Sequence, residues 1–266
     1  MAKNLTPQPK KRFGQHFLHD RGMVQRILDA LDPRAGETLV EIGPGAGALT
    51  RPLLDRIAHL HAVELDRDLA AQLRNDYSTD QLTVHEIDAL KFDFCALAPA
   101  ATKLRIVGNL PYNISTPLLF HLLDQEHCIG DMLFMLQKEV VTRMAAVPGN
   151  KDYGRLSVML QWRLRVEKLF DVKPGAFTPP PKVDSTVVRL IPHRAPPVSV
   201  RNAADFAQVV QAAFAQRRKT LRNNLKGLIP AESISALGIA PERRAETLSL
   251  AEFAALANRF SFSKPA

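Results

Sequence analysis

The first two-thirds of the chain alternate short apolar runs with longer segments compatible with helices. The apolar runs are rich in Val, Ile and Leu, and they occupy residues 38–43, 60–65, 82–87, 104–109 and 132–137. Strands that alternate with helices in this way form a parallel sheet covered on both faces. The pattern therefore predicts a doubly wound, Rossmann-like α/β domain, with "KVDSTVVRLIP" (182–192) as its last strand.

A linker that contains prolines follows this strand. The stretch "HRAPPVSVR" (193–201) separates the α/β region from mostly helical sequence that continues to about residue 260. We expect a catalytic domain at 1–195, which begins with a basic arm at 1–20, and a small helical domain at 196–266.

A glycine-rich loop follows the first predicted strand. Ligands of open α/β sheets bind at the carboxyl ends of the strands, so the residues that end each strand indicate the ligand. In "EIGPGAG" (41–47), Gly43, Gly45 and Gly47 let the backbone turn tightly and approach a ligand without Cβ atoms in the way. A plain tight turn remains an alternative, and Gly43, Gly45 and Ala48 also fit the dinucleotide fingerprint.

Acidic residues end the next two strands. Glu64 lies about 20 residues after the glycine loop, where a carboxylate can accept hydrogen bonds from both hydroxyls of a ribose. Asp88 ends the third strand and could accept from the amine of an adenine, although a capping or solvated aspartate is an equal alternative in isolation. Glycine, acid and acid in this order favour a ligand that contains a nucleoside.

The fourth strand ends in "GNLPY" (108–112), which favours chemistry on a base. An adenine amine is a poor nucleophile until acceptors hold its hydrogens and its nitrogen becomes tetrahedral. The side-chain oxygen of Asn109 and the carbonyl of Leu110 are two such acceptors, because Pro111 ends strand pairing and fixes the turn. Tyr112 supplies a face on which the base can stack. A proline turn with a buried tyrosine is the alternative interpretation.

Charge and composition limit the possible binding partners and the location of the protein. A net charge of +8 favours a polyanion such as nucleic acid, because a basic surface releases condensed counterions when it binds. The two cysteines, Cys95 and Cys128, lack metal-ligand spacing, so we expect reduced thiols, a cytoplasmic protein and no structural zinc. The sequence shows neither a signal peptide nor an apolar run long enough for a membrane span.

Eight segments, in order and over nearly the whole chain, resemble the ribosomal RNA adenine dimethyltransferases. They are "KRFGQHFL" (11–18), "VEIGPGAGALT" (40–50), "ELDRDLA" (64–70), "GNLPYNISTPLLFHLL" (108–123), "FMLQKEVVTRM" (134–144), "YGRLSV" (153–158), "FTPPPKVDSTVVRL" (177–190) and "QRRKTLRNNL" (216–225). The resemblance implies a class I methyltransferase domain that transfers methyl groups from S-adenosylmethionine to N6 of two adjacent adenines. These adenines lie near the 3′ end of 16S rRNA in the small ribosomal subunit or its precursor.

The resemblance also implies roles for particular residues. The cofactor is contacted by His16, Leu18, Gly43, Gly45, Glu64, Asp88 and Asn109. His16 departs from the usual motif, which often reads Gln-Asn-Phe-Leu, but an imidazole can still donate a hydrogen bond. The catalytic set is Asn109, Leu110, Pro111, Tyr112 and Phe177, with no metal. Prolines 179–181 could hold the Phe177 ring over the second face of the base, and a core phenylalanine is the alternative.

The RNA surface is predicted only coarsely. Residues 214–228 are predicted to be helical, with an apolar stripe of Phe214, Leu221, Leu225 and Leu228 that packs and an outward basic stripe of Lys219, Arg222 and Lys226. A solvated run of charges is the alternative. We expect a monomer.

Two other functions remain open. One is a large-subunit rRNA adenine dimethyltransferase of the macrolide-resistance type, which shares the fold and a similar motif after the fourth strand. The other is a non-catalytic RNA- or DNA-binding assembly or transcription factor on the same scaffold. The intact Glu64, Asp88 and Asn109 argue against the loss of chemistry.

Overall fold

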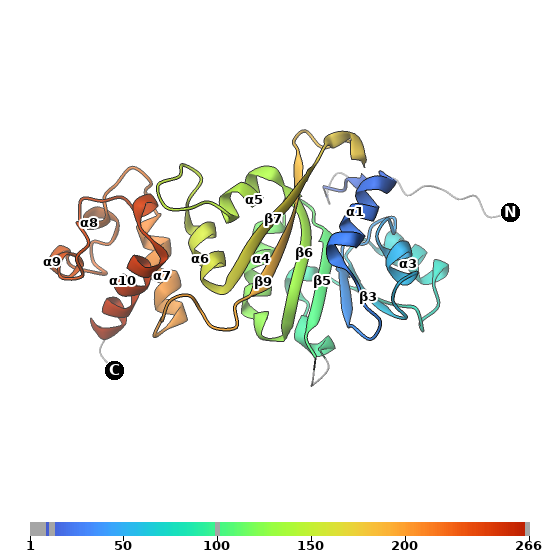
Figure 1. The fold of residues 1–266 in the computed structure, drawn as a ribbon, viewed down its shortest axis with the longest axis horizontal. Coiled ribbons are helices and arrows are strands. Elements are labelled where there is room, and N and C mark those ends of the chain that lie inside the picture. The colour runs from blue at the N-terminus through green and yellow to red at the C-terminus, as the bar shows by residue number, and fades with distance from the viewer. Residues whose placement is uncertain (1–8, 11–13, 99–101, 264–266) are drawn as a thin grey trace. The chain divides into compact units, whose positions relative to one another are not determined.

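The chain divides into two compact units. The computed structural model describes residues 9–10, 14–98 and 102–263 (Figure 1). One unit, called the sheet unit below, comprises residues 1–141 and 167–192, and the other, the helical unit, comprises residues 142–166 and 193–266. The domain boundary expected at residue 195 thus lies close to residue 193, where the chain passes from the sheet unit to the helical unit. Residues 142–166, which were expected in the first domain, group with the helical unit. Within that unit the Trp162 ring packs on Phe206, with centroids 4.5 Å apart.

The described residues form a seven-stranded sheet in the order β4-β3-β2-β5-β6-β9-β7 (Figure 1). The first five strands in this order, β4, β3, β2, β5 and β6, pair in parallel, and β9 pairs antiparallel with β6. The strands are β1 Phe17–Leu18, β2 Leu39–Ile42, β3 Leu60–Glu64, β4 Leu82–Glu86, β5 Leu104–Asn109, β6 Ile129–Gln137, β7 Leu164–Val172, β8 Phe177–Thr178 and β9 Ser185–Pro192. The predicted strands are confirmed, and β7 is a strand that the apolar pattern did not reveal.

Helices alternate with these strands. Their bounds are α1 Arg21–Leu31, α2 Thr50–Leu54, α3 Arg67–Asp76, α4 Ser115–Asp124, α5 Lys138–Met144, α6 Arg155–Arg163, α7 Ala203–Ala213, α8 Leu221–Asn224, α9 Ala231–Ser235 and α10 Leu250–Ser263. Leu28, Leu53 and Leu73 bring α1, α2 and α3 into one core with the sheet. Consecutive residues of β2, such as Leu39 and Val40, are both buried, so both faces of the sheet are covered. The predicted doubly wound fold is confirmed.

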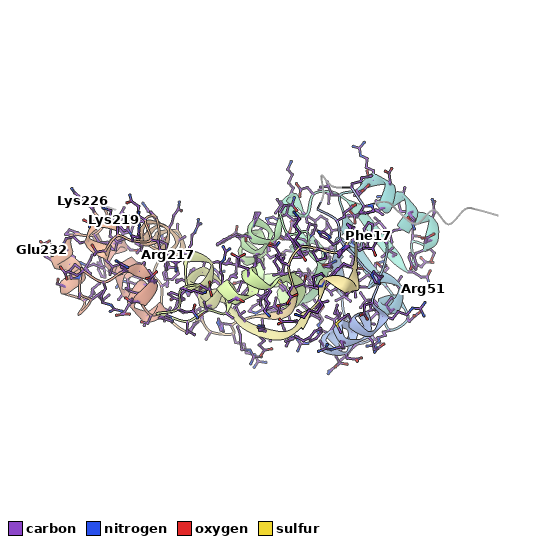
Figure 2. All side chains as sticks on the ribbon, turned by 90° about the horizontal axis from the view of Figure 1, so that it is seen from above. Phe17, Arg51, Arg217, Lys219, Lys226 and Glu232 are labelled. Atoms are coloured by element: carbon purple, nitrogen blue, oxygen red, sulfur yellow. A yellow bond between two sulfur atoms is a disulfide. The ribbon has the colours of Figure 1, made fainter. Side chains whose placement is uncertain are left out.

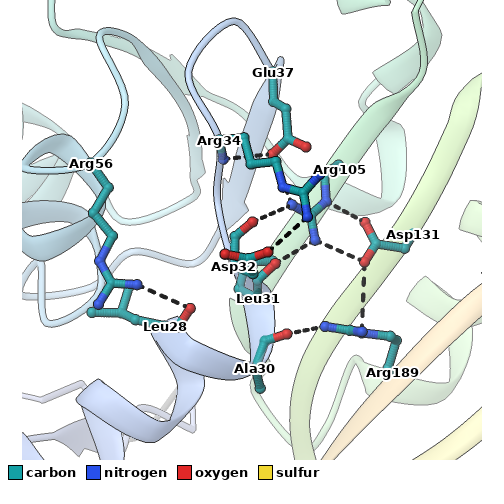
Figure 3. A network of polar contacts seen from close by, with 10 residues as sticks. All are labelled: Leu28, Ala30, Leu31, Asp32, Arg34, Glu37, Arg56, Arg105, Asp131 and Arg189. Carbon is teal, nitrogen blue, oxygen red and sulfur yellow. Dashed lines mark hydrogen bonds and ion pairs between the residues drawn. The ribbon is translucent and has the colours of Figure 1, made fainter.

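A polar network centred on Arg105 joins the carboxyl end of α1 to the sheet (Figure 3). The Arg105 guanidinium lies 2.6 Å from the Asp131 carboxylate and 2.8 Å from Glu37, and it also donates to the carbonyls of Leu31 and Asp32. Arg189 donates to the carbonyl of Ala30. The guanidinium therefore satisfies carbonyls that the last turn of a helix leaves without partners.

The two cysteines correct one prediction. Cys95 and Cys128 form a disulfide, so the expectation of reduced thiols is wrong. Gln125 brings their two turns together, because its side-chain oxygen accepts from the backbone N–H of Phe94, at 2.7 Å, and of Cys95. This tertiary contact joins segments about 30 residues apart, and cysteine spacing alone did not reveal it.

The basic stripe predicted on one helix is also wrong in its geometry. Helix α7 ends at Ala213, and only Leu221–Asn224 is helical in the following stretch. The Asn224 side chain donates to the carbonyls of Ala213, at 2.6 Å, and Gln216, and so caps the end of α7 in place of a further turn. The basic side chains are nevertheless exposed, and Figure 2 shows Arg217, Lys219 and Lys226 on the helical unit.

In the described part of the chain, every helix is too short or too polar to cross a membrane. Lys3, Lys11 and Arg12 of the predicted basic arm lie outside the described residues.

Candidate active site

One pocket lies at the carboxyl ends of β2, β3, β4 and β5. It brings together all but one of the predicted site residues: His16, Leu18, Gly43, Gly45, Glu64, Asp88, Asn109, Leu110, Pro111 and Tyr112. Parallel strands end at the same edge of a sheet, which is why residues distant in sequence meet here. The remaining predicted residue, Phe177, does not line the pocket.

The glycine loop requires its glycines. Gly43, Gly45 and Gly47 have φ values of 66°, 57° and 81°, in the left-handed region that favours glycine. A Cβ atom on Gly45 would also lie 3.1 Å from the ring of Phe17, which packs against the loop. The backbone of the loop is therefore held close to the N-terminal segment, and the tight-turn and ligand-binding interpretations describe the same geometry.

Glu64 is buried and holds the loop from the next strand. One carboxylate oxygen accepts from the N–H of Gly45 at 3.1 Å, and the other accepts from the N–H of Asp66 at 2.8 Å. Burial raises the pKa of the Glu64 carboxyl, and these two backbone hydrogen bonds oppose the rise. Each oxygen has a second lone pair, so the side chain can also accept from ligand hydroxyls.

A latch joins the N-terminal segment to this edge, and no motif in the sequence predicts it. Lys10 lies with its ammonium 2.6 Å from Asp66 and 2.5 Å from Asp68, and Gln15 donates to Asp66 at 3.2 Å. These contacts hold residues 14–18 against the pocket that they line. Asp66 also caps α3, so a capping aspartate was the only signal available.

The end of β4 combines an acid with apolar neighbours. One oxygen of the Asp88 carboxylate accepts from the N–H of Leu90 at 3.0 Å, and this is the only hydrogen bond that the side chain makes to the described residues. The capping interpretation is therefore correct for that oxygen and leaves the other open to a ligand. Leu65 and Ile87, which are not among the predicted site residues, line the same pocket and are 48% and 37% exposed. Exposed apolar side chains beside an acid suit a flat heterocycle with an amine.

The side chain of Asn109, at the end of β5, is held in one orientation. The Asn109 nitrogen donates to the carbonyl of His16 at 2.9 Å, which directs the side-chain oxygen as the remaining acceptor. The Leu110 N–H donates to Met135 at 3.2 Å and the Leu110 side chain is buried, so this backbone is fixed. The structure thus leaves acceptors at the two positions that the sequence analysis proposed.

Tyr112 and His16 lie next to this turn. The Tyr112 hydroxyl is 2.8 Å from the Ser185 hydroxyl, and its ring centroid is 5.6 Å from that of His16. Burial raises the pKa of Tyr112, which keeps its hydroxyl protonated. Nδ1 of His16 lies 2.7 Å from the Pro179 carbonyl and donates to it, because a carbonyl can only accept.

Phe177 lies elsewhere. Its strand, β8, pairs with β1, and its side chain is 2% exposed within the core that includes Leu18 and Val187. A place over the base would require the ring to leave this core, so the structure gives no support to the predicted stacking role and favours the core interpretation.

Glu41 is a second buried acid that the sequence analysis did not single out. It lines the pocket, and its carboxylate accepts from the Thr50 hydroxyl at 2.7 Å. Burial raises the pKa of Glu41 to about 7, with a smaller contribution from the nearby Glu64. Its signal was present in the sequence, as an acid inside an apolar strand directly before the glycine loop.

Comparison with known proteins identifies the family of the chain. A 62% identical relative, the ribosomal RNA small subunit methyltransferase A of Thiobacillus denitrificans, matches 93% of this chain and 96% of its own. A dimethyladenosine transferase from Plasmodium falciparum has a similar structure, with a TM-score of 0.76 and 26% identity over 91% of this chain and 96% of that one. The 23S rRNA methyltransferase ErmE has a TM-score of 0.69 and 26% identity, over 92% and 99% of the two chains.

The family described as ribosomal RNA adenine dimethylase matches residues 7–261, which is nearly the whole chain. The chain therefore belongs to the ribosomal RNA adenine dimethylases, enzymes that methylate adenine in ribosomal RNA.

Proposed function

We propose that the enzyme dimethylates N6 of two adjacent adenines near the 3′ end of 16S rRNA, during assembly of the small ribosomal subunit. The 62% identity to a small subunit methyltransferase over the full length is the observation that carries this substrate. The 23S rRNA methyltransferase is only 26% identical, which argues against the large-subunit alternative. We further propose that the enzyme works as a monomer in the cytoplasm; the rRNA substrate supports this location, whereas the Cys95–Cys128 disulfide does not.

Methyl groups in this family come from S-adenosylmethionine, which supplies a methyl already activated on a sulfonium sulfur. The pocket fits this donor. Glu64 can accept from ribose hydroxyls, and Leu65, Ile87 and Asp88 suit the faces and the amine of an adenine. The acids Glu41 and Glu64 also suit a ligand that carries positive charge. These assignments support a role for the pocket residues in binding the donor.

The protein contributes positioning. Asn109 Oδ1 and the Leu110 carbonyl accept from the two amine hydrogens of the target adenine, so the nitrogen becomes tetrahedral as it approaches the methyl group. Tyr112 stacks on the base, which must leave its helix to reach the site. Positioning of two reactants in line can supply several kcal/mol of a barrier. A strong base is unnecessary, because a methylated adenine ammonium loses its proton to water.

The donor site can be tested at Glu64. Replacement of Glu64 by Ala removes hydrogen bonds to a charged group, so S-adenosylmethionine should bind more weakly by about 1.5 to 3 kcal/mol, or roughly 10- to 150-fold. Isothermal titration calorimetry measures this change. Glu86→Ala is a matched control, because Glu86 pairs in register with Glu64 but is exposed and does not line the pocket. Equal affinities of the Glu64→Ala variant and the parent would remove Glu64 from the site.

Binding of RNA to the helical unit is supported by its basic surface. Arg222 and Lys226 line a hollow together with Asn223 and Gly227, and both basic side chains are exposed. The Arg222 guanidinium lies 2.8 Å from Glu242, an exposed pair that contributes little in water and can open for a phosphate. We propose that this hollow contacts the RNA backbone.

Salt dependence tests this surface. In the Arg222→Ala/Lys226→Ala variant, rRNA should bind more weakly, and the plot of log K against log salt should be shallower by about 0.7 to 0.9 for each phosphate that the variant no longer neutralises. Filter binding over a salt series provides the slope. Lys103→Ala is the control for the removal of a positive charge, because Lys103 is exposed just before β5 starts, at the opposite edge of the sheet from the pocket. An unchanged slope in the double variant would show that the hollow does not meet phosphate.

A further inference from the structure

The strand β6 also ends in a polar side chain at the carboxyl edge of the sheet. Met132 to Leu136 are all buried, and Gln137 follows as the last residue of the strand. Because β6 runs parallel to β5, Gln137 lies at the same edge as Asn109. No role for this residue emerges from the pocket described above, which it does not line.

The register of the sheet places Gln137 beside the proposed base site. Gln137 pairs with Ser185 of the antiparallel strand β9, and directly opposed residues point to the same face with Cβ atoms about 4.5 to 5.5 Å apart. The Ser185 hydroxyl in turn contacts the hydroxyl of Tyr112. Gln137 is therefore a neighbour of the tyrosine that lines the pocket.

The same register relates Gln137 to Asn109. Asn109 pairs with Met135 in the parallel ladder, and Met135 precedes Gln137 by two residues. Residues two apart in a strand share a face, so Asn109 and Gln137 lie on one face, one step apart along the edge. Tyr112 joins this row through Ser185.

The amide of Gln137 is uncommitted. It is partly exposed, and within the described ranges its side chain makes no hydrogen bond. The neighbouring side chains, by contrast, have polar partners: the Lys138 ammonium lies 2.6 Å from Asp171, and the Ser185 hydroxyl is hydrogen-bonded to Tyr112. The backbone is fixed at this point, since the N–H of Lys138 donates to the Asp184 carbonyl at 3.0 Å. A positioned amide with a free donor and a free acceptor is suited to recognition of a base.

We propose that Gln137 recognises the target adenine, with its side-chain nitrogen donating to a ring nitrogen, N1 or N7, that flanks the amine. Adenine offers an acceptor on each side of the amine, and an amide side chain is the group that proteins use to contact the adenine amine and N7. The inference rests on the proposed function, in which Asn109 and Leu110 hold the amine itself. Gln137 then acts as a specificity residue that sets the orientation of the ring.

The test combines a side-chain change with a change in the base. Small subunits are reconstituted with rRNA whose target adenines are adenosine, 7-deazaadenosine or 1-deazaadenosine, and single-turnover methylation is measured for each. The parent should lose about 5- to 30-fold in rate on one analogue. Gln137→Met, which keeps the size of the side chain but cannot donate, should lose a similar factor on adenosine and show no further loss on that analogue.

Matched variants separate this result from structural damage. Gln72→Met makes the same change at a partly exposed glutamine of α3 outside the pocket, and it should behave as the parent does on all three substrates. S-adenosylmethionine should bind the Gln137→Met variant with unchanged affinity. Parental rates in Gln137→Met, or equal further losses on both analogues, would overturn the proposal. If Asn109→Ala also retained its rate, the proposed site would fail as a whole, whereas failure at Gln137 alone leaves that site intact.

Discussion

Replacement of Asn109 by Ala should slow methyl transfer by about 10²- to 10³-fold, the loss typical of one preorganised polar contact in an active site. The physical reason is that the Asn109 oxygen and the Leu110 carbonyl interact more strongly with the amine as its nitrogen becomes tetrahedral. Only interactions that strengthen in the transition state accelerate the reaction. Single-turnover transfer of tritiated methyl groups to undermethylated small subunits measures the effect.

Three measurements separate a loss of catalysis from damage to the fold or to RNA binding. The variant also loses the hydrogen bond from Asn109 to the His16 carbonyl, so its thermal midpoint and its RNA affinity must be compared with those of the parent. Asn75→Ala, at an exposed asparagine in α3, is the control for the loss of an amide. A folded Asn109→Ala enzyme that dimethylates both adenines at the parental rate would exclude the proposed mechanism, although the family would stand.

Much of the site could be predicted because the topology of the sheet brings its residues together. Once apolar runs and helices alternate, the sheet is parallel, and residues that follow different strands must meet at one edge. Gly43, Glu64, Asp88 and Asn109 were found by this rule, and the structure places all four in one pocket. Gln137 obeys the same rule. Gln137 lies in the segment "FMLQKEVVTRM" (134–144), but nothing in that segment by itself indicates contact with a base, and the relation of Gln137 to Tyr112 depends on the register with β9.

The features that could not be predicted depend on contacts between distant segments. The ion pair between Lys10 and Asp66 joins two charged residues that are far apart in sequence. A basic chain offers many possible pairs of this kind, so the sequence does not single this one out. The stripe at 214–228 satisfied helical spacing, but the Asn224 side chain ends α7, and the N–H of Leu221 donates to Arg243 instead. Local propensity was overruled there by tertiary hydrogen bonds, which a periodicity argument cannot include.

Phe177 illustrates a different difficulty. A phenylalanine before three prolines is compatible both with a stacking ring and with a buried one, and the sequence alone does not decide between them. The outcome depends on β8, a two-residue strand that pairs with β1 and turns the ring into the core. Such a short pairing has no periodicity that could reveal it, whereas its consequence for the site is large.

Replacement of Gly108 by Ala should destabilise the sheet unit by about 1 to 3 kcal/mol, the usual cost of an extra methyl group in a packed core. A Cβ atom on Gly108 would lie 2.5 Å from the carbonyl oxygen of Ile42 and 3.0 Å from the Leu110 side chain. Both obstacles lie in a buried region, and the first is backbone, so β2 and β5 must move apart. Urea denaturation measures the change in the free energy of unfolding.

The same substitution should also impair catalysis, because Ile42 directly precedes the glycine loop and Gly108 directly precedes Asn109. A shift between these two strands separates the proposed donor site from the amine acceptors, and small misplacements of reacting groups cost about 10²-fold in rate. Gly130→Ala in β6 is the matched control, since its Cβ would meet its nearest neighbours at 3.4 Å. That variant should keep nearly parental stability and activity. A Gly108→Ala enzyme as stable and active as Gly130→Ala would mean that the close contact between β2 and β5 does not position the site.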